Sequence, residues 1–154
     1  MSRELRVASL GAEVRANQAA VDAFDEAVAA HLGINRTDLR CLDVLLQELG
    51  AEATPGRLGG RLGLTTGSVT AMVDRLERLG YLTRSPDPAD RRKVVVRPTE
   101  AILAKTAEIY GPLAAEGEDL LSRYTVEELE LIADFMRRSR ELQQSHLARL
   151  RAAG

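Results

Sequence analysis

Apolar residues recur at alternating steps of three and four positions through the first thirty residues of the chain. The repeating positions are Val7, Leu10, Val14, Asn17, Val21, Phe24, Val28 and His31. This a/d spacing is typical of a helix that packs along another helix. It predicts one helix over residues 3–32, about 45 Å long at ~1.5 Å per residue. A chain of 154 residues rarely covers so long a stripe by itself, so we expect part of it to meet a second copy.

Asn17 interrupts this apolar stripe, and the sequence leaves its role open. A polar residue on a helix–helix seam fixes the register of the two helices at some cost in stability. A side chain at the edge of the stripe points to solvent instead. The pattern favours the two interpretations equally.

The middle of the chain predicts three shorter helices, each bounded by capping residues. Gly33 ends the long helix, and leucines at helical spacing follow it up to residue 49. The predicted N-caps are Asn35, Thr54 (with Pro55 at the first helical position) and Thr65 or Thr66, and the predicted stop residues are Gly50, Gly63 and Gly80.

After residue 80 the apolar period changes from helix to strand. Residues 81–84 and 94–97 predict two short strands, and the Pro- and Asp-rich SPDPADRRK segment between them predicts a hairpin loop that carries three cations. Thr99 can cap a fifth helix, which we expect to be disturbed at Gly111–Pro112. Thr125 and Glu128 predict a capping box for a last helix.

Charge is distributed unevenly along the chain, although the formal net charge is only −2. Residues 57–97 contain nine Arg or Lys and four Asp or Glu, so this segment carries +5 and the rest of the chain −7. A basic block in an otherwise acidic protein predicts a face that binds a polyanion. In that block we expect Asp74 and Glu77 to form exposed pairs with Arg75 and Arg78.

Composition and motifs exclude several classes of protein. With 45% hydrophobic and 29% charged residues the chain is globular, and charged residues interrupt every apolar run before it could span a membrane. A secretory signal is not expected, so we predict a cytoplasmic protein. One cysteine and two distant histidines predict no disulfide, metal or cofactor. Without a catalytic motif, the sequence does not predict an enzyme.

A short helix, a tight turn at residues 62–64 and a second helix that begins with small hydroxylated residues form a helix-turn-helix pattern. Small side chains let the first turn of a helix approach base edges in the major groove of DNA. The residues with this property are Thr65, Thr66, Gly67, Ser68 and Thr70. The hairpin that follows could place Arg91, Arg92 or Lys93 against the phosphate backbone or in the minor groove.

Residues 62–100 (LGLTTGSVTAMVDRLERLGYLTRSPDPADRRKVVVRPTE) resemble the winged-helix core of the MarR family of transcriptional regulators. The run VDRLERLGYL followed by DPADRR carries the resemblance, and residues 32–46 and the long flanking helices fit the same family. The resemblance therefore covers essentially the whole chain. It implies a single, mainly α domain: a winged helix-turn-helix with a two-stranded β-wing at about residues 35–100, and dimerisation helices at about 3–32 and 100–150.

The resemblance also implies a function and a set of contacts. The expected protein is a homodimer that binds a pseudo-palindromic operator in double-stranded DNA, usually as a repressor, and that a small aromatic or anionic effector releases. Ser68, Thr70 and Arg75 would face the groove, Arg84 would lie at the base of the wing, and an Asp90–Arg92 bridge would set the angle of the wing. The expected DNA-binding residues are Thr65, Thr66, Ser68, Thr70, Arg75, Arg84, Arg91, Arg92 and Lys93, and the expected dimer contacts are Leu10, Val14, Val21, Leu142 and Leu150.

Some positions leave alternatives open. Ala71 stands where many members carry Arg or another polar residue, which moves the expected sequence readout to Thr70, Arg75 and the wing. It also supports a different function, a winged-helix, ligand-responsive interaction module without specific DNA readout. We expect Cys41 to be a packed thiol rather than a peroxide sensor. Tyr110 and Tyr124 fit either an aromatic effector pocket or core packing.

Overall fold

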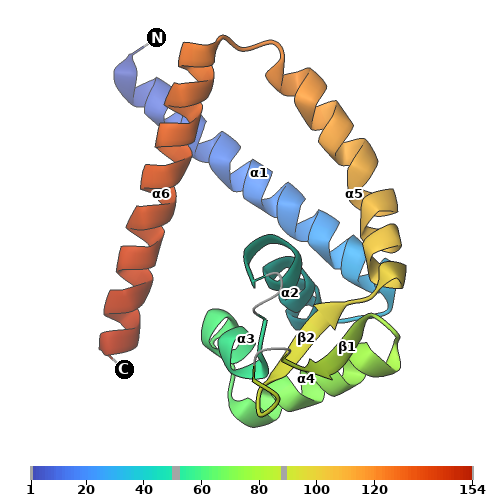
Figure 1. Cartoon of the computed structure of the whole chain (residues 1–154). Coiled ribbons are helices and arrows are strands. Elements are labelled where there is room, and N and C mark those ends of the chain that lie inside the picture. The colour runs from blue at the N-terminus through green and yellow to red at the C-terminus, as the bar shows by residue number, and fades with distance from the viewer. Residues whose placement is uncertain (1, 50–52, 88–89, 154) are drawn as a thin grey trace. The chain divides into compact units, whose positions relative to one another are not determined.

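The computed structural model describes residues 2–49, 53–87 and 90–153 of the chain. They fall into two compact units, residues 1–109 and 110–154. In chain order the elements are α1 (Arg3–Leu32), α2 (Arg36–Val44), a π-helical segment η1 (Leu45–Leu49), α3 (Pro55–Leu62), α4 (Thr66–Arg78), β1 (Leu82–Pro86), β2 (Val94–Pro98), α5 (Glu100–Leu121) and α6 (Val126–Ala152), as Figure 1 shows. The mainly helical architecture with a two-stranded wing is confirmed.

The predicted helix boundaries are confirmed where a capping residue sets them. Thr54, Thr65 and Thr125 each accept a hydrogen bond from the backbone N–H three residues on, at 3.3 Å. Asn35 forms a reciprocal capping box with Asp38. Gly33, Gly63 and Gly80 end their helices or the turns that follow at φ of 67–74°, a left-handed conformation that costs glycine little.

Two helical predictions differ from the structure. The second helix does not stay α-helical to its end, because α2 stops at Val44 and continues as η1; the predicted stop at Gly50 lies outside the described residues. The expected disturbance at Gly111–Pro112 does not divide α5, which runs through both residues to Leu121. The boundary between the two compact units nevertheless falls beside this site, after Ile109.

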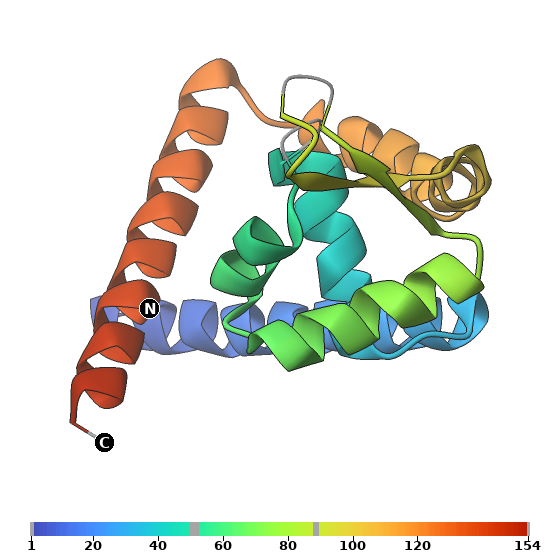
Figure 2. The same ribbon diagram turned by 60° about the horizontal axis from the view of Figure 1, so that its bottom comes forward.

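The core of the first unit lies between α2, α3, α4 and the β-hairpin. In Figure 2 a short turn joins α3 to α4. Gly63 caps the end of α3, and α2 packs against both helices. Leu58 and Leu76 are fully buried there, and Leu42 is 1% exposed. Burying each such side chain contributes about 1.5–3 kcal/mol, so these contacts fix how the two helices of the helix-turn-helix meet.

The two strands predicted from the sequence form an antiparallel hairpin and are slightly longer than predicted. Leu82 pairs with Pro98 and Pro86 with Val94, so the alternation places Val96 opposite Arg84. The N–H of Val96 donates to the carbonyl of Ala53 at 2.8 Å, which ties the hairpin to the segment before α3. The wing is therefore anchored to the helix-turn-helix at its base.

Tyr81 connects the start of the hairpin to two helices. Its hydroxyl donates to the carbonyl of Leu32 at the end of α1, at 2.9 Å, and its ring is 7% exposed. The ammonium of Lys105 on α5 lies 5.7 Å from the centre of the ring, within cation–π range. The N–H of Thr99 donates to the carbonyl of Tyr81 at 3.0 Å.

The second unit contains the end of α5 and all of α6. The predicted capping box is confirmed: Thr125 caps α6, and the carboxylate of Glu128 accepts from the Thr125 N–H at 2.9 Å. No described residue of α6 is buried. Most of its large apolar side chains, including those of Leu142 and Leu150, are exposed.

Candidate nucleic-acid interface

The first turns of α4 present a small, polar and exposed surface. Thr66, Gly67, Ser68, Thr70 and Ala71 are all exposed, whereas Val69, Met72 and Val73 on the opposite face are buried. Side chains this short allow the backbone of a helix to come close to the floor of the major groove. The small residues that the sequence predicted for this face are therefore accessible to solvent on α4.

Two of the hydroxyl groups on this surface already bond within the helix. Thr65 Oγ1 accepts from the Ser68 N–H and lies 3.0 Å from Ser68 Oγ. Thr70 Oγ1 donates to the carbonyl of Thr66 at 3.0 Å. These bonds hold the hydroxyls in fixed orientations, and Thr65 acts first as the cap of α4.

The close approach of α3 to α4 depends on glycine at position 59. A Cβ atom at Gly59 would lie 3.1 Å from Val69 Cγ2 and 3.3 Å from the carbonyl oxygen of Leu64. A Cβ atom at Gly60 would meet nothing within 4 Å, so packing does not require a glycine at that position. Packing against α4 therefore explains the glycine at position 59 but not the one at position 60.

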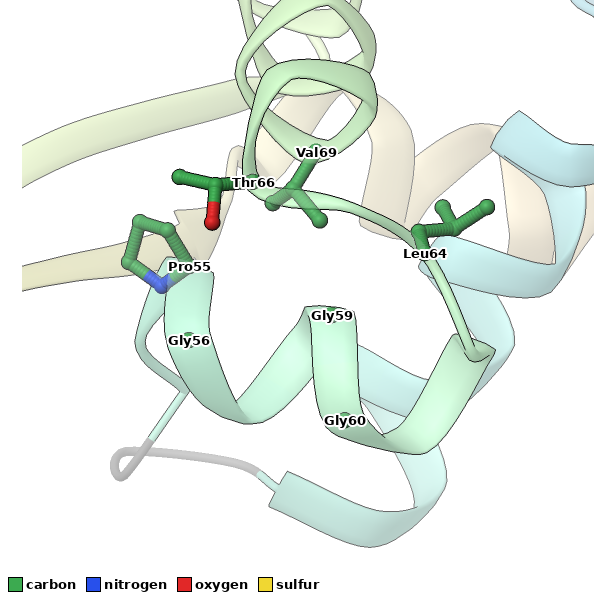
Figure 3. Close-up of a pocket in the computed structure, with 7 residues that line it drawn as sticks. All are labelled: Pro55, Gly56, Gly59, Gly60, Leu64, Thr66 and Val69. Carbon is green, nitrogen blue, oxygen red and sulfur yellow. The ribbon is translucent and has the colours of Figure 1, made fainter.

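A small cavity lies at this helix corner, as Figure 3 shows. Its volume is about 110 Å³, and its lining includes Pro55, Gly59, Leu64, Thr66 and Val69. Pockets for small molecules begin at about 300 Å³. The cavity is a packing feature of the corner and is too small to hold an aromatic effector in this conformation.

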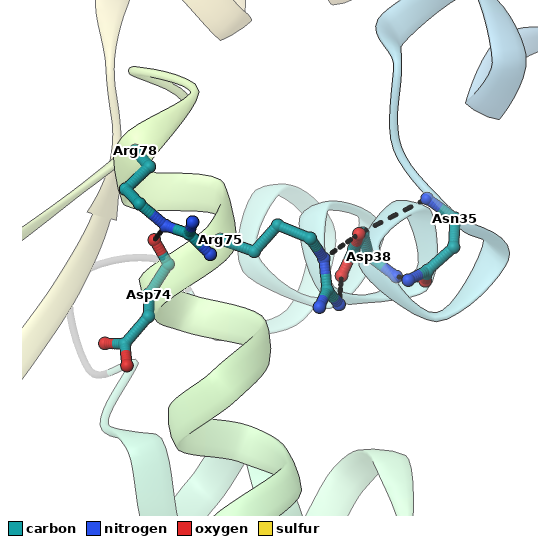
Figure 4. Close-up of polar contacts among 5 residues, drawn as sticks. All are labelled: Asn35, Asp38, Asp74, Arg75 and Arg78. Atoms are coloured by element: carbon teal, nitrogen blue, oxygen red, sulfur yellow. Dashed lines mark hydrogen bonds and ion pairs between the residues drawn. The ribbon is translucent and has the colours of Figure 1, made fainter.

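The side chain of Arg75 reaches from α4 across to Asp38 on α2 (Figure 4). Its Nε donates to Asp38 Oδ2 at 2.8 Å and its Nη2 to Asp38 Oδ1 at 2.5 Å. The Asp38 side chain is fully buried, whereas the Arg75 side chain is 38% exposed. The hydrogen bonds to Asp38 raise the pKa of Arg75, so the guanidinium stays charged. The sequence predicted a groove contact for Arg75 and contained no sign of this partner, 37 residues away.

Arg84 likewise binds carboxylates of the same chain. Its guanidinium pairs with Asp74 and lies 3.6 Å from the carboxylate of Glu77, both on α4. The backbone N–H of Arg84 also donates a hydrogen bond to the Glu77 carboxylate at 3.2 Å. Asp74 and Glu77 were expected to pair with Arg75 and Arg78; instead they hold the first strand of the wing. Arg78 donates from Nε to the backbone carbonyl of Asp74 at 3.3 Å.

The cationic tip of the wing is exposed. Arg91, Arg92 and Lys93 lie between the strands with exposed side chains. Asp90 accepts a hydrogen bond from the Arg92 backbone N–H at 3.1 Å, and its carboxylate lies 4.0 Å from Lys93 Nζ. The contact between Asp90 and Arg92 is thus made by the backbone N–H of Arg92 and not by its guanidinium.

Cys41 is a packed thiol, as expected. The residue is fully buried on α2. Desolvation, assisted by the negative charge of Asp38, raises the pKa of the thiol to about 12. The thiolate is therefore scarce at neutral pH, which argues against a role in peroxide sensing.

Comparison with known proteins matches this architecture to one family. Residues 32–93, from the end of α1 to the tip of the wing, match the model of the MarR family. YcgE, an uncharacterized HTH-type transcriptional regulator of Bacillus subtilis strain 168, is 44% identical over 128 residues, which cover 83% of this chain and 82% of that protein. The chain belongs to the MarR family.

Further comparisons agree with this membership. The HTH-type transcriptional regulator MhqR of the same organism is 28% identical over 80% of this chain and 83% of its own length. A MarR family protein from Bacillus stearothermophilus superposes with a TM-score of 0.63 at 26% identity, over 94% of this chain and 98% of that structure. This MarR-family chain is a DNA-binding transcriptional regulator. Across the part of the chain that the structure describes, each helix is too short or too polar to cross a membrane.

The dimer contacts expected of a MarR-family chain are exposed apolar residues. On α1, Leu10 is 50%, Val14 38% and Val21 45% exposed, whereas Val28 on the same stripe is buried. The chain covers the C-terminal end of the stripe by itself and leaves the rest open. Tyr124 is 43% exposed, which rules out core packing for that ring in the free chain.

Proposed function

We propose that this MarR-family regulator is a homodimeric repressor that binds a pseudo-palindromic operator and that a small aromatic or anionic molecule releases. The observation that carries the proposal is the pairing of two exposed surfaces in one unit. One is the hydroxyl-bearing start of α4, and the other is the cationic tip of the wing. The first suits base edges in the major groove and the second suits phosphates.

In this proposal Thr66, Ser68 and Thr70 contact bases, and Arg91, Arg92 and Lys93 contact the DNA backbone or the minor groove. Thr65 and Arg84 support these contacts, since the first caps α4 and the second joins α4 to the wing. The exposed apolar residues of α1 and α6 form the dimer interface, with Leu10, Val14 and Val21 on one helix and Leu142 and Leu150 on the other.

The test of DNA binding is a selection from a random double-stranded library, followed by gel-shift titration of the enriched sequence. Two recognition helices on one side of a duplex lie about 34 Å apart. We therefore expect an inverted repeat whose half-sites are one helical turn apart. Enrichment of no sequence above scrambled DNA would favour the interaction module without DNA readout, which Ala71 supports.

The division between backbone and base contacts is tested with Arg91→Ala, Lys93→Ala and Thr70→Ala. Removing one phosphate-binding cation should reduce the slope of log K against log salt by about 0.9 and weaken binding to all sequences. Thr70→Ala should instead relax the preference at one base position. Equal weakening on selected and scrambled DNA for all three variants would refute this assignment.

The effector is tested by thermal shift with phenolic and carboxylate compounds. A ligand present at about 100 times its dissociation constant adds about 2.7 kcal/mol to the stability of the state that binds it. The expected result is a compound that both raises the melting temperature and lowers the affinity for the selected DNA. A compound that only stabilises the protein would not be the effector.

A further inference from the structure

Asp38 combines features that a residue needed only for helix capping does not require. Its carboxylate accepts three hydrogen bonds, one from the Asn35 N–H at 3.2 Å and two from Arg75 at 2.8 and 2.5 Å. Among the residues that the structure describes, Asp38 is the one charged residue that is fully buried. An isolated buried carboxylate is strongly unfavourable, so the site is built around Arg75.

The bond between them joins α4, the proposed recognition helix, to α2 in the core. Asp38 lies in the first turn of α2, inside the core unit, and Arg75 lies on α4, two turns beyond Ser68. Apolar contacts hold α4 on the core but are not directional. A two-point bond between a planar guanidinium and a carboxylate is directional, so it resists rotation of α4 about its own axis.

Small rotations of α4 matter because base contacts have narrow tolerances. Helical side chains end about 5–6 Å from the helix axis, so a rotation of about 10° moves a contacting atom by about 1 Å. Hydrogen bonds to base edges span only about 2.7–3.2 Å. Phosphate contacts made by long arginine and lysine side chains of the wing adapt to such a shift, whereas contacts from Ser68 and Thr70 do not.

We infer that Asp38 is a positioning residue for sequence recognition: it holds Arg75 as a clamp that sets the rotation of α4, and Arg75 is not itself a DNA contact. The inference rests on the proposed DNA binding and assigns it a specificity-determining pair outside the DNA surface. It reverses the role that the sequence predicted for Arg75.

The experiment uses the full-length protein, the DNA selected from the random library and a scrambled duplex, each titrated at several salt concentrations. The variants are Asp38→Asn and Arg75→Ala, with Arg91→Ala as the phosphate-contact reference. Arg40→Ala, an exposed arginine on α2, controls for charge alone. Thermal unfolding followed by circular dichroism gives a temperature at which every variant is folded, and urea unfolding measures the stability of each variant there. All DNA titrations are made at that temperature.

The clamp predicts that Asp38→Asn and Arg75→Ala each weaken binding to selected DNA at least tenfold but change binding to scrambled DNA less than twofold. The salt slope should stay at the wild-type value, whereas Arg91→Ala should reduce it. Asp38→Asn makes the protein more positive, so charge alone predicts tighter binding, opposite to the effect of the clamp. A double variant, Asp38→Asn with Arg75→Gln, restores a neutral hydrogen-bonding pair and should recover part of the specificity.

Other outcomes overturn the inference in recognisable ways. If Asp38→Asn binds more tightly and Arg75→Ala reduces the salt slope by about 0.9, Arg75 is a DNA contact that Asp38 restrains. If both variants bind selected and scrambled DNA equally more weakly, the Asp38–Arg75 pair contributes to general stability and not to sequence recognition. If the wild type prefers no sequence, the proposed function fails and the inference fails with it.

A spectroscopic arm gives an independent readout. The Nε–H resonance of Arg75, assigned by its loss in Arg75→Lys, should keep its position when selected DNA is added. Movement of that resonance to a new position on binding DNA would show that the guanidinium leaves Asp38, and would contradict the clamp.

Discussion

The winged-helix core and the helix α6 use apolar residues in opposite ways. The buried apolar residues of the described chain run from Val28 to Ile102, and Leu58 and Leu76 among them are fully buried. On α6 most of the large apolar side chains are exposed to solvent, with Leu131 71% and Leu150 73% exposed. The first region is stabilised by its own contacts, whereas the second carries an apolar surface that a folded monomer rarely leaves open. Substitutions in the two regions should therefore affect different quantities.

The largest effect is expected in the core. Leu76→Ala removes a fully buried side chain between α4 and its neighbours and should lower the free energy of unfolding by about 2–5 kcal/mol. Urea unfolding measures this decrease, and its midpoint should shift by the same amount at low and high protein concentration. A decrease in the free energy of unfolding of less than about 1 kcal/mol would mean that Leu76 is not packed in the core as described.

A smaller but qualitatively different effect is expected on α6. Leu142→Asp places a charge on a residue that is 61% exposed in the single chain, and twofold symmetry repeats it on the partner. The dimer dissociation constant should rise about 100-fold, or about 2.7 kcal/mol, as measured by light scattering over a dilution series.

The matched control for this prediction is Gln144→Asp, which adds the same charge on the opposite side of α6. Gln144→Asp should leave the particle mass measured by light scattering equal to that of the wild type. A dimer that survives Leu142→Asp, or that dissociates equally with both variants, would remove Leu142 from the proposed interface.

Adjacent glycines 59 and 60 of α3 give a sharper test of the packing within the core region. Gly59→Ala should destabilise the protein by about 1–3 kcal/mol, because the new Cβ would lie 3.1 Å from Val69 Cγ2. Gly60→Ala meets open space and should stabilise it by up to about 1 kcal/mol through helix propensity. Urea unfolding of both variants measures the difference, and equal signs would refute the close approach of α3 and α4.

The smallest effect concerns Asp43, which is half-buried on α2. Burial, and then the charge of Asp25, raise the pKa of Asp43 above 3.8, while Arg40 opposes them. A raised pKa in the folded state makes the ionised form unfavourable there, so stability is lost as the pH rises through that pKa. Asp43→Asn should therefore match the wild type near pH 3 and exceed it increasingly by pH 7, by less than about 1 kcal/mol after solvent screening. Urea unfolding across this range measures the difference, and a constant offset would contradict the pKa shift.

Local features of this chain were predictable and distant pairings were not. Asn35, Thr54 and Thr125 were identified as caps, and the cap of α4 was narrowed to Thr65 or Thr66, because a cap and the N–H groups it binds lie within four residues. The wing followed from a change of period and a Pro- and Asp-rich loop. The π-helical end of α2 has no such signal, since leucines continue along it without a break.

The candidate site shows the same limit. The exposed start of α4 and the cations of the wing could be placed from spacing alone. Arg75 and Arg84 could not, because a basic residue on an exposed helix has the same local pattern whether it binds DNA or a carboxylate. Asp38 carried no signal beyond helix capping, and only the packing of α2 against α4 brings it to Arg75.

The phenol of Tyr81 links the end of the long N-terminal helix α1 to the start of the wing. Since its hydroxyl holds the last turn of α1 at 2.9 Å while its backbone leads directly into β1, any tilt of α1 that preserves this bond carries the root of the wing along. A displacement of the last turn of α1 would thus pass to the root of the hairpin through this one hydrogen bond.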